Sequence, residues 1–153
     1  MEPTSRKYLF FDLDGTLTDS MPGIARAVQY ALRRFGIDVQ DLAALKPFLG
    51  PPLRDSFMEF YGMSPEEADR AVAVSREYFV PRGMFENELY PGIPELLAAT
   101  AAAGRVNVIA TSKPQPFAER IAAHFGIDRH FRLISGSTFD GRRKTKADVI
   151  RHA

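Results

Sequence analysis

The sequence predicts an α/β protein, with a doubly wound, Rossmann-like parallel sheet as its core and an inserted all-helical cap domain. The run Tyr8-Leu9-Phe10-Phe11 is short and continuously apolar, and Asp12 follows it directly. Such a run is typical of a strand that is buried on both faces of a parallel sheet. Residues 19–88 carry only helical signals, and after Pro91-Gly92 strand patterns alternate with helical ones. This alternation is the pattern of a doubly wound fold.

Three helices are predicted within residues 19–88. Apolar residues recur at helical spacing over residues 22–35, and Gly36 supplies the stop. A second amphipathic stretch follows Pro51-Pro52 and ends at Gly62. The third helix has the clearest start, because residues 64–67 combine the spacing of a capping box with proline at the first helical position. We therefore expect that helix over Pro65–Phe79.

The remaining elements complete the core domain. They are short and alternate in type: a helix over 94–103, a strand over 106–110, a helix around 117–125, a strand over 131–135 and a last helix capped by Thr145. The predicted domains are therefore an α/β core made of residues 1–18 and 89–153, and a helical cap made of residues 19–88.

The composition and charge of the chain exclude some kinds of site and make some kinds of partner unnecessary. The chain has 153 residues and no cysteine, which excludes disulfides and thiolate metal sites. Its formal net charge is +1, so nothing in the charge balance calls for a nucleic acid polymer. The four-residue apolar run near the N-terminus is too short for a signal peptide or for a membrane span of about 20 residues. We expect a cytoplasmic protein that does not bind membranes.

The residues after the first strand carry the chemistry. Ligands of open parallel sheets bind beyond the carboxyl ends of the strands, where Asp12-Leu13-Asp14-Gly15 lies. Two carboxylates two residues apart in extended backbone lie on one side and can share Mg²⁺. One carboxylate can attack phosphorus and the other can transfer protons, while Gly15 permits a sharp turn. The alternative is that this segment is only a turn without a function. Its position after a buried-type strand and the Thr-Leu-Thr-Asp-Ser that follows it favour a catalytic site.

The segment from Phe10 to Leu17, Phe-Phe-Asp-Leu-Asp-Gly-Thr-Leu, resembles the first motif of the haloacid dehalogenase superfamily of phosphatases. Within that superfamily the sequence is most similar to the phosphoglycolate phosphatase-like group and its 5′-nucleotidase-like relatives. Residues 48–53 and 110–114 are particularly similar to the latter. The resemblance implies Mg²⁺-dependent hydrolysis of a small phosphorylated metabolite through an aspartyl phosphate. Phosphoglycolate and a nucleoside 5′-monophosphate are both compatible with a helical cap that closes over the site.

The resemblance also implies roles for individual residues. Asp12 would be the nucleophile and a Mg²⁺ ligand, and Asp14 would be the acid–base group with its backbone carbonyl on the metal. Thr111, after the second strand, would supply the hydroxyl that hydrogen-bonds the phosphoryl group, with Ser112 as the alternative. These groups would act by positioning and by stabilising charge.

The cation and the substrate-binding residues follow in the same way. Lys146 matches the family position at the start of the last helix, and Lys144 remains open as an alternative. Gly15, Ser112 and Lys113 are expected to bind substrate. Without the resemblance, Lys144 and Lys146 would be interpreted as part of a solvated basic run over residues 142–146.

Two cap residues are candidates for contacts to substrate groups beyond the phosphate. They are Lys46 and Arg54, and Arg54 follows Pro51-Pro52-Leu53 at the start of a helix. Arginines on exposed helices are usually solvated, so a surface role is the alternative.

A fourth family motif, acidic residues after a further strand that complete the Mg²⁺ site, has no match. After Lys146 the sequence contains only Asp148, on a predicted helix. We therefore expect the C-terminal part of the core to be missing from this chain. The absent strand would lie beside the first one, so residues 8–11 should form an exposed apolar edge.

Other activities of the same fold are less compatible with the residues. A dehalogenase does not need the acid at Asp14, and a phosphonatase would carry a non-acidic residue there. A phosphomutase would keep both aspartates and stays open. A non-catalytic binding module with an incomplete site is the alternative from a different class.

Overall fold

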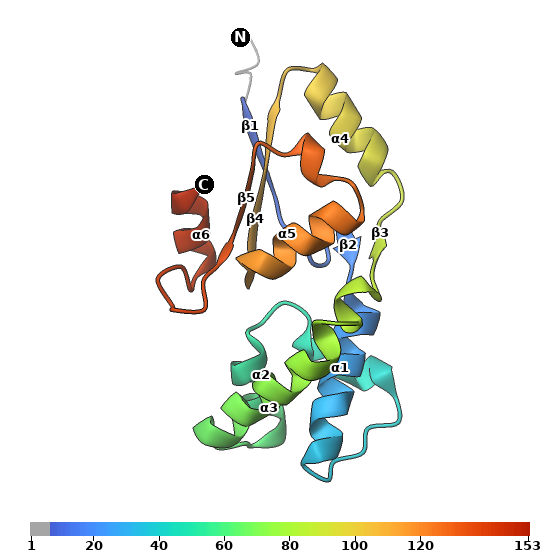
Figure 1. Ribbon diagram of the computed structural model, residues 1–153, viewed down its shortest axis with the longest axis vertical. Coiled ribbons are helices and arrows are strands. Elements are labelled where there is room, and N and C mark those ends of the chain that lie inside the picture. Colours follow the sequence, from blue (N-terminus) through green and yellow to red (C-terminus); the bar gives the residue numbers. More distant parts are fainter. Residues whose placement is uncertain (1–6) are drawn as a thin grey trace. The chain divides into compact units, whose positions relative to one another are not determined.

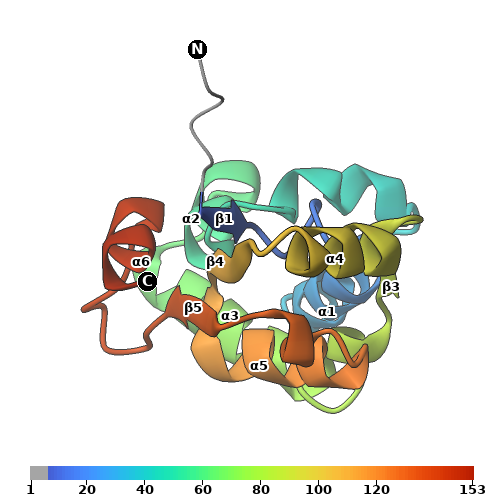
Figure 2. The same cartoon turned by 90° about the horizontal axis from the view of Figure 1, so that it is seen from above.

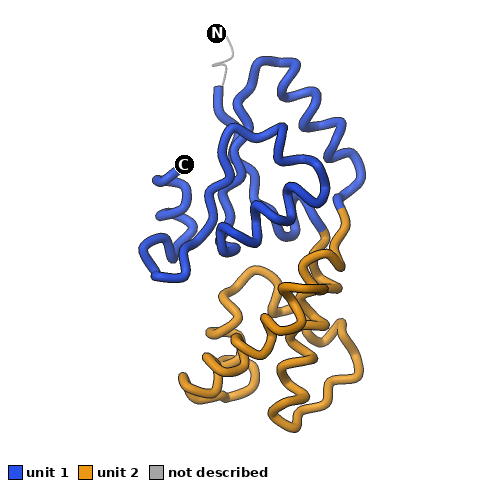
Figure 3. Tube along the Cα trace, in the orientation of Figure 1, with its two compact units in different colours: residues 1–18, 89–153 blue, residues 19–88 orange. Residues whose placement is uncertain are grey.

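The computed structural model describes residues 7–153 (Figure 1). The chain forms two compact units, one holding residues up to Thr18 together with Leu89–Ala153, and the other holding Asp19–Glu88 (Figure 3). Two short paired strands, β2 (Thr18–Asp19) and β3 (Glu88–Leu89), carry the chain from one unit into the other. The smaller unit is thus an insertion into the larger one.

The larger unit is built on a parallel sheet. Its strands β1 (Tyr8–Phe11), β4 (Val106–Pro114) and β5 (Leu133–Ser137) lie in the order β1-β4-β5. Three helices alternate with these strands along the chain: α4 (Ile93–Ala102) precedes β4, α5 (Gln115–His124) follows β4, and α6 (Lys146–His152) follows β5. A short 3-10 turn, η3 (Asp128–His130), lies before β5. Figure 2 shows α4 and α5 on one face of the sheet and α6 on the other. The predicted α/β fold with a parallel sheet is confirmed.

The two strands nearest the site differ in burial. Central β4 is buried over Val108, Ile109 and Ala110, as predicted for a strand covered on both faces. The same prediction is wrong for β1, because Tyr8 is 51% exposed and Phe10 49% exposed. Within the described residues β1 pairs only with β4, so it lies at the edge of the sheet. The exposed apolar edge that the sequence analysis expected here is confirmed.

The smaller unit is helical. It contains α1 (Met21–Arg34), α2 (Leu53–Tyr61) and α3 (Pro65–Phe79), together with two 3-10 segments, η1 (Leu42–Phe48) and η2 (Gly83–Phe85). The third helix has the bounds predicted from its capping box, and both reciprocal hydrogen bonds of that box are present. The segment η1 was not predicted from the sequence; it contains Pro47, and its apolar residues Leu42, Leu45 and Phe48 recur every three positions.

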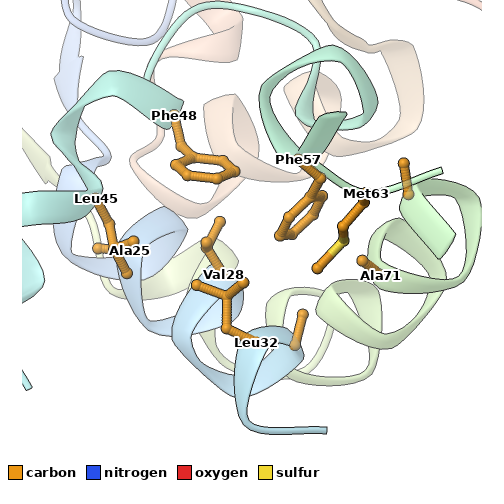
Figure 4. Close-up of a cluster of buried hydrophobic side chains, with 10 residues drawn as sticks. Ala25, Val28, Leu32, Leu45, Phe48, Phe57, Met63 and Ala71 are labelled. Atoms are coloured by element: carbon orange, nitrogen blue, oxygen red, sulfur yellow. The ribbon is translucent and has the colours of Figure 1, made fainter. Parts of the chain in front are cut away.

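The helical unit has a hydrophobic core of its own (Figure 4). Its buried members come from α1, η1, α2 and α3 and from the α2–α3 connection: Ala25, Val28, Ala31, Leu32, Leu45, Phe48, Phe57, Met63, Ala68 and Ala71. Phe48 and Phe57 meet edge to face with ring centroids 5.1 Å apart, a favoured aromatic geometry.

A separate observation concerns membranes. Over residues 7–153, none of the helices is both long enough and apolar enough to cross a lipid bilayer.

Candidate active site

A tight loop after β1 presents the two aspartates. The backbone N–H groups of residues 16–18 donate to the carbonyl oxygen of Leu13 at 3.0–3.3 Å. The side chains of Leu13 and Leu17 are fully buried and anchor the loop to the core. Gly15 has a φ of 74°, a left-handed conformation that glycine adopts without strain. This loop fixes the backbone of both aspartates at the carboxyl end of the strand.

Asp12 forms an ion pair with Lys146. The Nζ atom of Lys146 lies 2.7 Å from Oδ2 of Asp12 and also donates to the carbonyl oxygen of Ala110 at 2.6 Å. The other oxygen of Asp12 accepts the N–H of Leu13 at 2.8 Å. Lys146 is the first residue of α6, so the start of that helix places its ammonium at the carboxyl end of the sheet. Lys146, rather than Lys144, is therefore the lysine at ion-pair distance from Asp12.

Asp14 has a different lysine. Nζ of Lys113, near the end of β4, lies 3.0 Å from Oδ2 of Asp14, and the two side chains are only 6% and 16% exposed. The second carboxylate oxygen of Asp14, Oδ1, is buried and has no hydrogen-bond partner among residues 7–153. A substrate-binding role was predicted for Lys113, whereas its contact with Asp14 was not, because the sequence carries no signal for that contact.

Thr111, like Asp12, lies at the carboxyl end of the parallel strands. Parallel pairing aligns Phe11 with Ile109, so the residues that follow the two strands come together. Thr111 is buried, and its hydroxyl oxygen accepts the N–H of Lys113 at 3.2 Å. A hydroxyl that accepts in this way still has its proton to donate. Ser112, the predicted alternative, is exposed.

The ends of β4 and β5 and the loop before α6 are tied together by one side chain. Oε1 of Gln115 accepts the N–H of Gly136 at 3.1 Å and a guanidinium N–H of Arg143 at 3.2 Å. Gln115 and Arg143 border a cavity of about 390 Å³. Sequence reasoning missed this network, because its members lie on separate elements and show no shared pattern.

Two carboxylates in this region have shifted pKa values. The hydroxyl of Thr138, and then the backbone and side chain of Arg142, lower the pKa of Asp140 to about 2. Hydrogen bonds from the side chain and backbone of Thr145 lower the pKa of Asp148. Both shifts favour the ionised carboxylates that hold the loop and the start of α6.

Arg54 and Lys46 lie in the helical unit. Nε of Arg54 forms a 2.7 Å ion pair with Asp69, and the two side chains are 43% and 62% exposed. Lys46 is an exposed residue of η1. Arg54 thus has a partner within its own unit, and the substrate contacts of both residues stay predictions.

The residues of the loop after β1 could supply only a few of the ligands of a Mg²⁺ ion. In the described part of the chain, no group of three or more His, Cys, Asp or Glu side chains is placed to hold a metal. Mg²⁺ usually takes one or two carboxylates and completes its shell with water and substrate phosphate. The half-exposed carboxylate of Asp12 would supply one such ligand, and the family resemblance adds the backbone carbonyl of Asp14 as a second.

The chain is similar in sequence to a known family and to several known proteins. Residues 9–153 match the model of the haloacid dehalogenase-like hydrolases. A 5′-nucleotidase of Pseudomonas aeruginosa is 52% identical over 144 residues, which cover 94% of this chain and 65% of that protein. The tyrosine-protein kinase PtkA of Mycobacterium tuberculosis is 40% identical over 97% of this chain and 50% of its own length. A phosphoglycolate phosphatase of Yersinia pestis is 34% identical over 82% of this chain and 56% of its own.

Solved structures of phosphatases are also similar to this chain. The crystal structure of a predicted phosphatase from Clostridium acetobutylicum matches with a TM-score of 0.91 and 48% identity, covering 96% of this chain and 68% of that one. The chain thus spans about half to two thirds of the curated relatives that it matches. On its motif, its fold and these matches, the chain belongs to the haloacid dehalogenase-like hydrolases.

Proposed function

We propose that this chain hydrolyses a small phosphomonoester, with Asp12 as the nucleophile and Mg²⁺ as the cofactor. The observation that carries the proposal is the Asp12 carboxylate at the carboxyl end of the sheet, 2.7 Å from Lys146, with a second carboxylate two residues along. A cation at that distance offsets the repulsion between an attacking carboxylate and a phosphate.

The reaction has two displacements at phosphorus. An oxygen of Asp12 attacks phosphorus, the bond to the ester oxygen breaks, and Asp14 gives its proton to the leaving alcohol. Asp14 then takes a proton from water, which attacks the aspartyl phosphate and releases inorganic phosphate, so that Asp12 is restored. Through both steps Lys146 balances the negative charge, and Thr111 donates to a phosphoryl oxygen. Mg²⁺, bound through Asp12 and Asp14, would supply further charge neutralisation.

Names of relatives suggest the substrate class. Relatives named 5′-nucleotidase and phosphoglycolate phosphatase are 52% and 34% identical to this chain. We propose a nucleoside 5′-monophosphate or phosphoglycolate as the substrate. A panel of both, beside a generic aryl phosphate, separates the two.

A second candidate is transfer of the phosphoryl group to a hydroxyl acceptor other than water. It is favoured by the 40% identity to a protein named as a tyrosine kinase, which extends over 97% of this chain. Transfer would use the same aspartyl phosphate and the same acid–base group, with an alcohol in place of the attacking water.

The test is phosphate release from an aryl phosphate, measured with Mg²⁺ and with a chelator, by the wild type and by Asp12→Asn. We expect release that needs Mg²⁺ and disappears in the variant. Release of the aryl alcohol that exceeds release of phosphate when a second alcohol is added would indicate transfer. Wild type and variant that are folded and equally inert would refute the enzymatic proposal and favour a binding module.

A further inference from the structure

We propose that Lys113 is a positioning residue, which holds the acid–base carboxyl of Asp14 through one oxygen and leaves the other oxygen for the proton. The inference rests on the proposed function, because it assigns a task within the same reaction. It replaces the substrate-binding role that the sequence alone predicts for Lys113.

The contact itself divides the Asp14 carboxyl into two parts. Nζ of Lys113 lies 3.0 Å from Oδ2, in surroundings where both side chains are almost fully enclosed. Oδ1 is buried and has no hydrogen-bond partner among the described residues, so it is the oxygen that remains to carry a proton. A carboxyl that is fixed by one oxygen cannot rotate freely, so the free oxygen keeps one direction through both half-reactions.

The backbone at Lys113 is also held. Its N–H donates to the hydroxyl of Thr111 at 3.2 Å, within the stretch where the pairing of β4 with β5 shifts register. On the other side the chain passes close to Gly136, where an added Cβ would lie 2.7 Å from the carbonyl oxygen of Lys113. Only glycine permits this approach. A lysine anchored in this way can direct a second residue, as a supporting group around an active site must.

The two lysine–aspartate pairs differ in exposure, and the difference separates their tasks. In the pair of Lys146 and Asp12 the side chains are 39% and 43% exposed. An exposed pair contributes little to stability, so Lys146 can exchange Asp12 for an incoming phosphate. In the pair of Lys113 and Asp14 they are 6% and 16% exposed, and breaking such a pair would leave the enclosed Asp14 carboxylate without its lysine. Lys113 therefore stays on Asp14 during turnover.

The test is a double-mutant cycle with Lys113→Met and Asp14→Asn, using an alkyl phosphate such as a nucleoside monophosphate, whose leaving group needs a proton. Since proton transfer contributes about 10²–10⁴-fold, we expect Lys113→Met to lower kcat about 10–100-fold, with KM within about twofold of wild type. In the Asp14→Asn background the same substitution should have no further effect, because its target is gone. Lys7→Met, on an exposed lysine, is the matched control and should behave as wild type.

A lysine that bound the phosphate directly would give another pattern. KM would rise, and the loss would be the same in both backgrounds, which would overturn the proposal. Circular dichroism and the unfolding temperature of each variant exclude loss of fold as the cause.

A second measurement does not depend on activity. In carbon-13 spectra of the side-chain carboxyls, Lys113→Met should move the resonance of Asp14 and leave that of Asp12 in place. An unmoved Asp14 resonance would show that the pair does not form and would overturn the positioning role, whatever the activity. If wild type is no more active than Asp12→Asn, the proposed function fails and the positioning role falls with it, even where the resonance moves.

Discussion

Asp12 and Asp14 stand two residues apart on one loop, yet the structure gives each its own lysine. Lys146 approaches Asp12 from the start of α6, while Lys113 approaches Asp14 from the end of β4. Each pair carries no net negative charge, whether or not Asp14 holds its proton, so a dianionic phosphate would not meet an excess of negative charge in this loop. The exposed pair can reorganise and the enclosed pair cannot, which suits the separate roles of nucleophile and acid–base group.

Replacing Lys146 tests the role of the exposed pair. Lys146→Met removes the ammonium beside Asp12, and since losing one such stabilising group typically costs about 10²–10³-fold in rate, we expect a fall of that size in kcat/KM. Steady-state kinetics with Mg²⁺ saturating provide the measurement. Lys144→Met is the matched comparison and should change kcat/KM by less than about threefold, within the small effects of surface charge. A larger loss of kcat/KM in Lys144→Met than in Lys146→Met would show that Lys144 supplies the cation.

The sequence predicts part of this site and misses part. The pair Asp12 and Asp14 can be identified from two carboxylates after a buried-type strand, because that pattern is local. Lys146 is reached only through resemblance to a family, since a lysine in a basic run has no distinguishing local signal. The contact of Lys113 with Asp14 depends on where β4 ends relative to the loop after β1, which no local pattern specifies.

Elements with local signals were predicted best. The bounds of α3 match the prediction because Ser64 and Glu67 form a capping box that depends only on neighbouring residues. The strand β4 runs on to Pro114, beyond the predicted Ala110, since pairing with β5 resumes after the apolar run has ended. The exposure of β1 was predicted wrongly from its composition, because burial of a strand depends on which neighbours cover it.

The start of α6 is the element on which the position of Lys146 depends. The hydroxyl of Thr145 accepts the N–H of Asp148 at 3.1 Å and donates to its carboxylate at 2.6 Å, and Lys146 is the next residue after this cap. Fraying of the first turn would therefore move the ammonium away from Asp12.

Thr145→Ala should weaken both the helix and the activity. We expect a loss of about 1 kcal/mol in the free energy of unfolding, as for other cap deletions, together with a lower kcat. Chemical denaturation and steady-state kinetics measure the two effects. Thr145→Ser keeps the hydroxyl and should restore both; equal damage in the serine variant would argue against the cap as the cause.

Considered as a whole, the molecule consists of two units that each bury their own apolar residues. The buried cluster of the helical unit lies entirely within Asp19–Glu88. The catalytic candidates Asp12, Asp14, Thr111 and Lys146 belong to the α/β unit. Stability of the helical unit and assembly of the site are therefore expected to respond to different substitutions.

Phe57→Ala tests this separation. Phe57 is fully buried in the helical unit, and deleting such a side chain typically costs about 3–5 kcal/mol. We expect faster backbone amide exchange over residues 19–88, with exchange in the strand Val106–Pro114 unchanged. Hydrogen exchange followed by mass spectrometry gives both readings in one experiment. Equal acceleration in both units would show that they unfold together.

The nucleophilic role of Asp12 can be tested most directly by trapping the covalent intermediate. The chain is mixed with Mg²⁺ and an aryl phosphate, quenched in acid, reduced with borohydride and digested for mass spectrometry. We predict that Asp12 is converted to the alcohol that reduction of an acyl phosphate produces, and that this product is absent without substrate and in Asp12→Asn. Phosphate release with Asp12 unmodified, or a trapped phosphoryl group on another residue, would contradict the proposed mechanism.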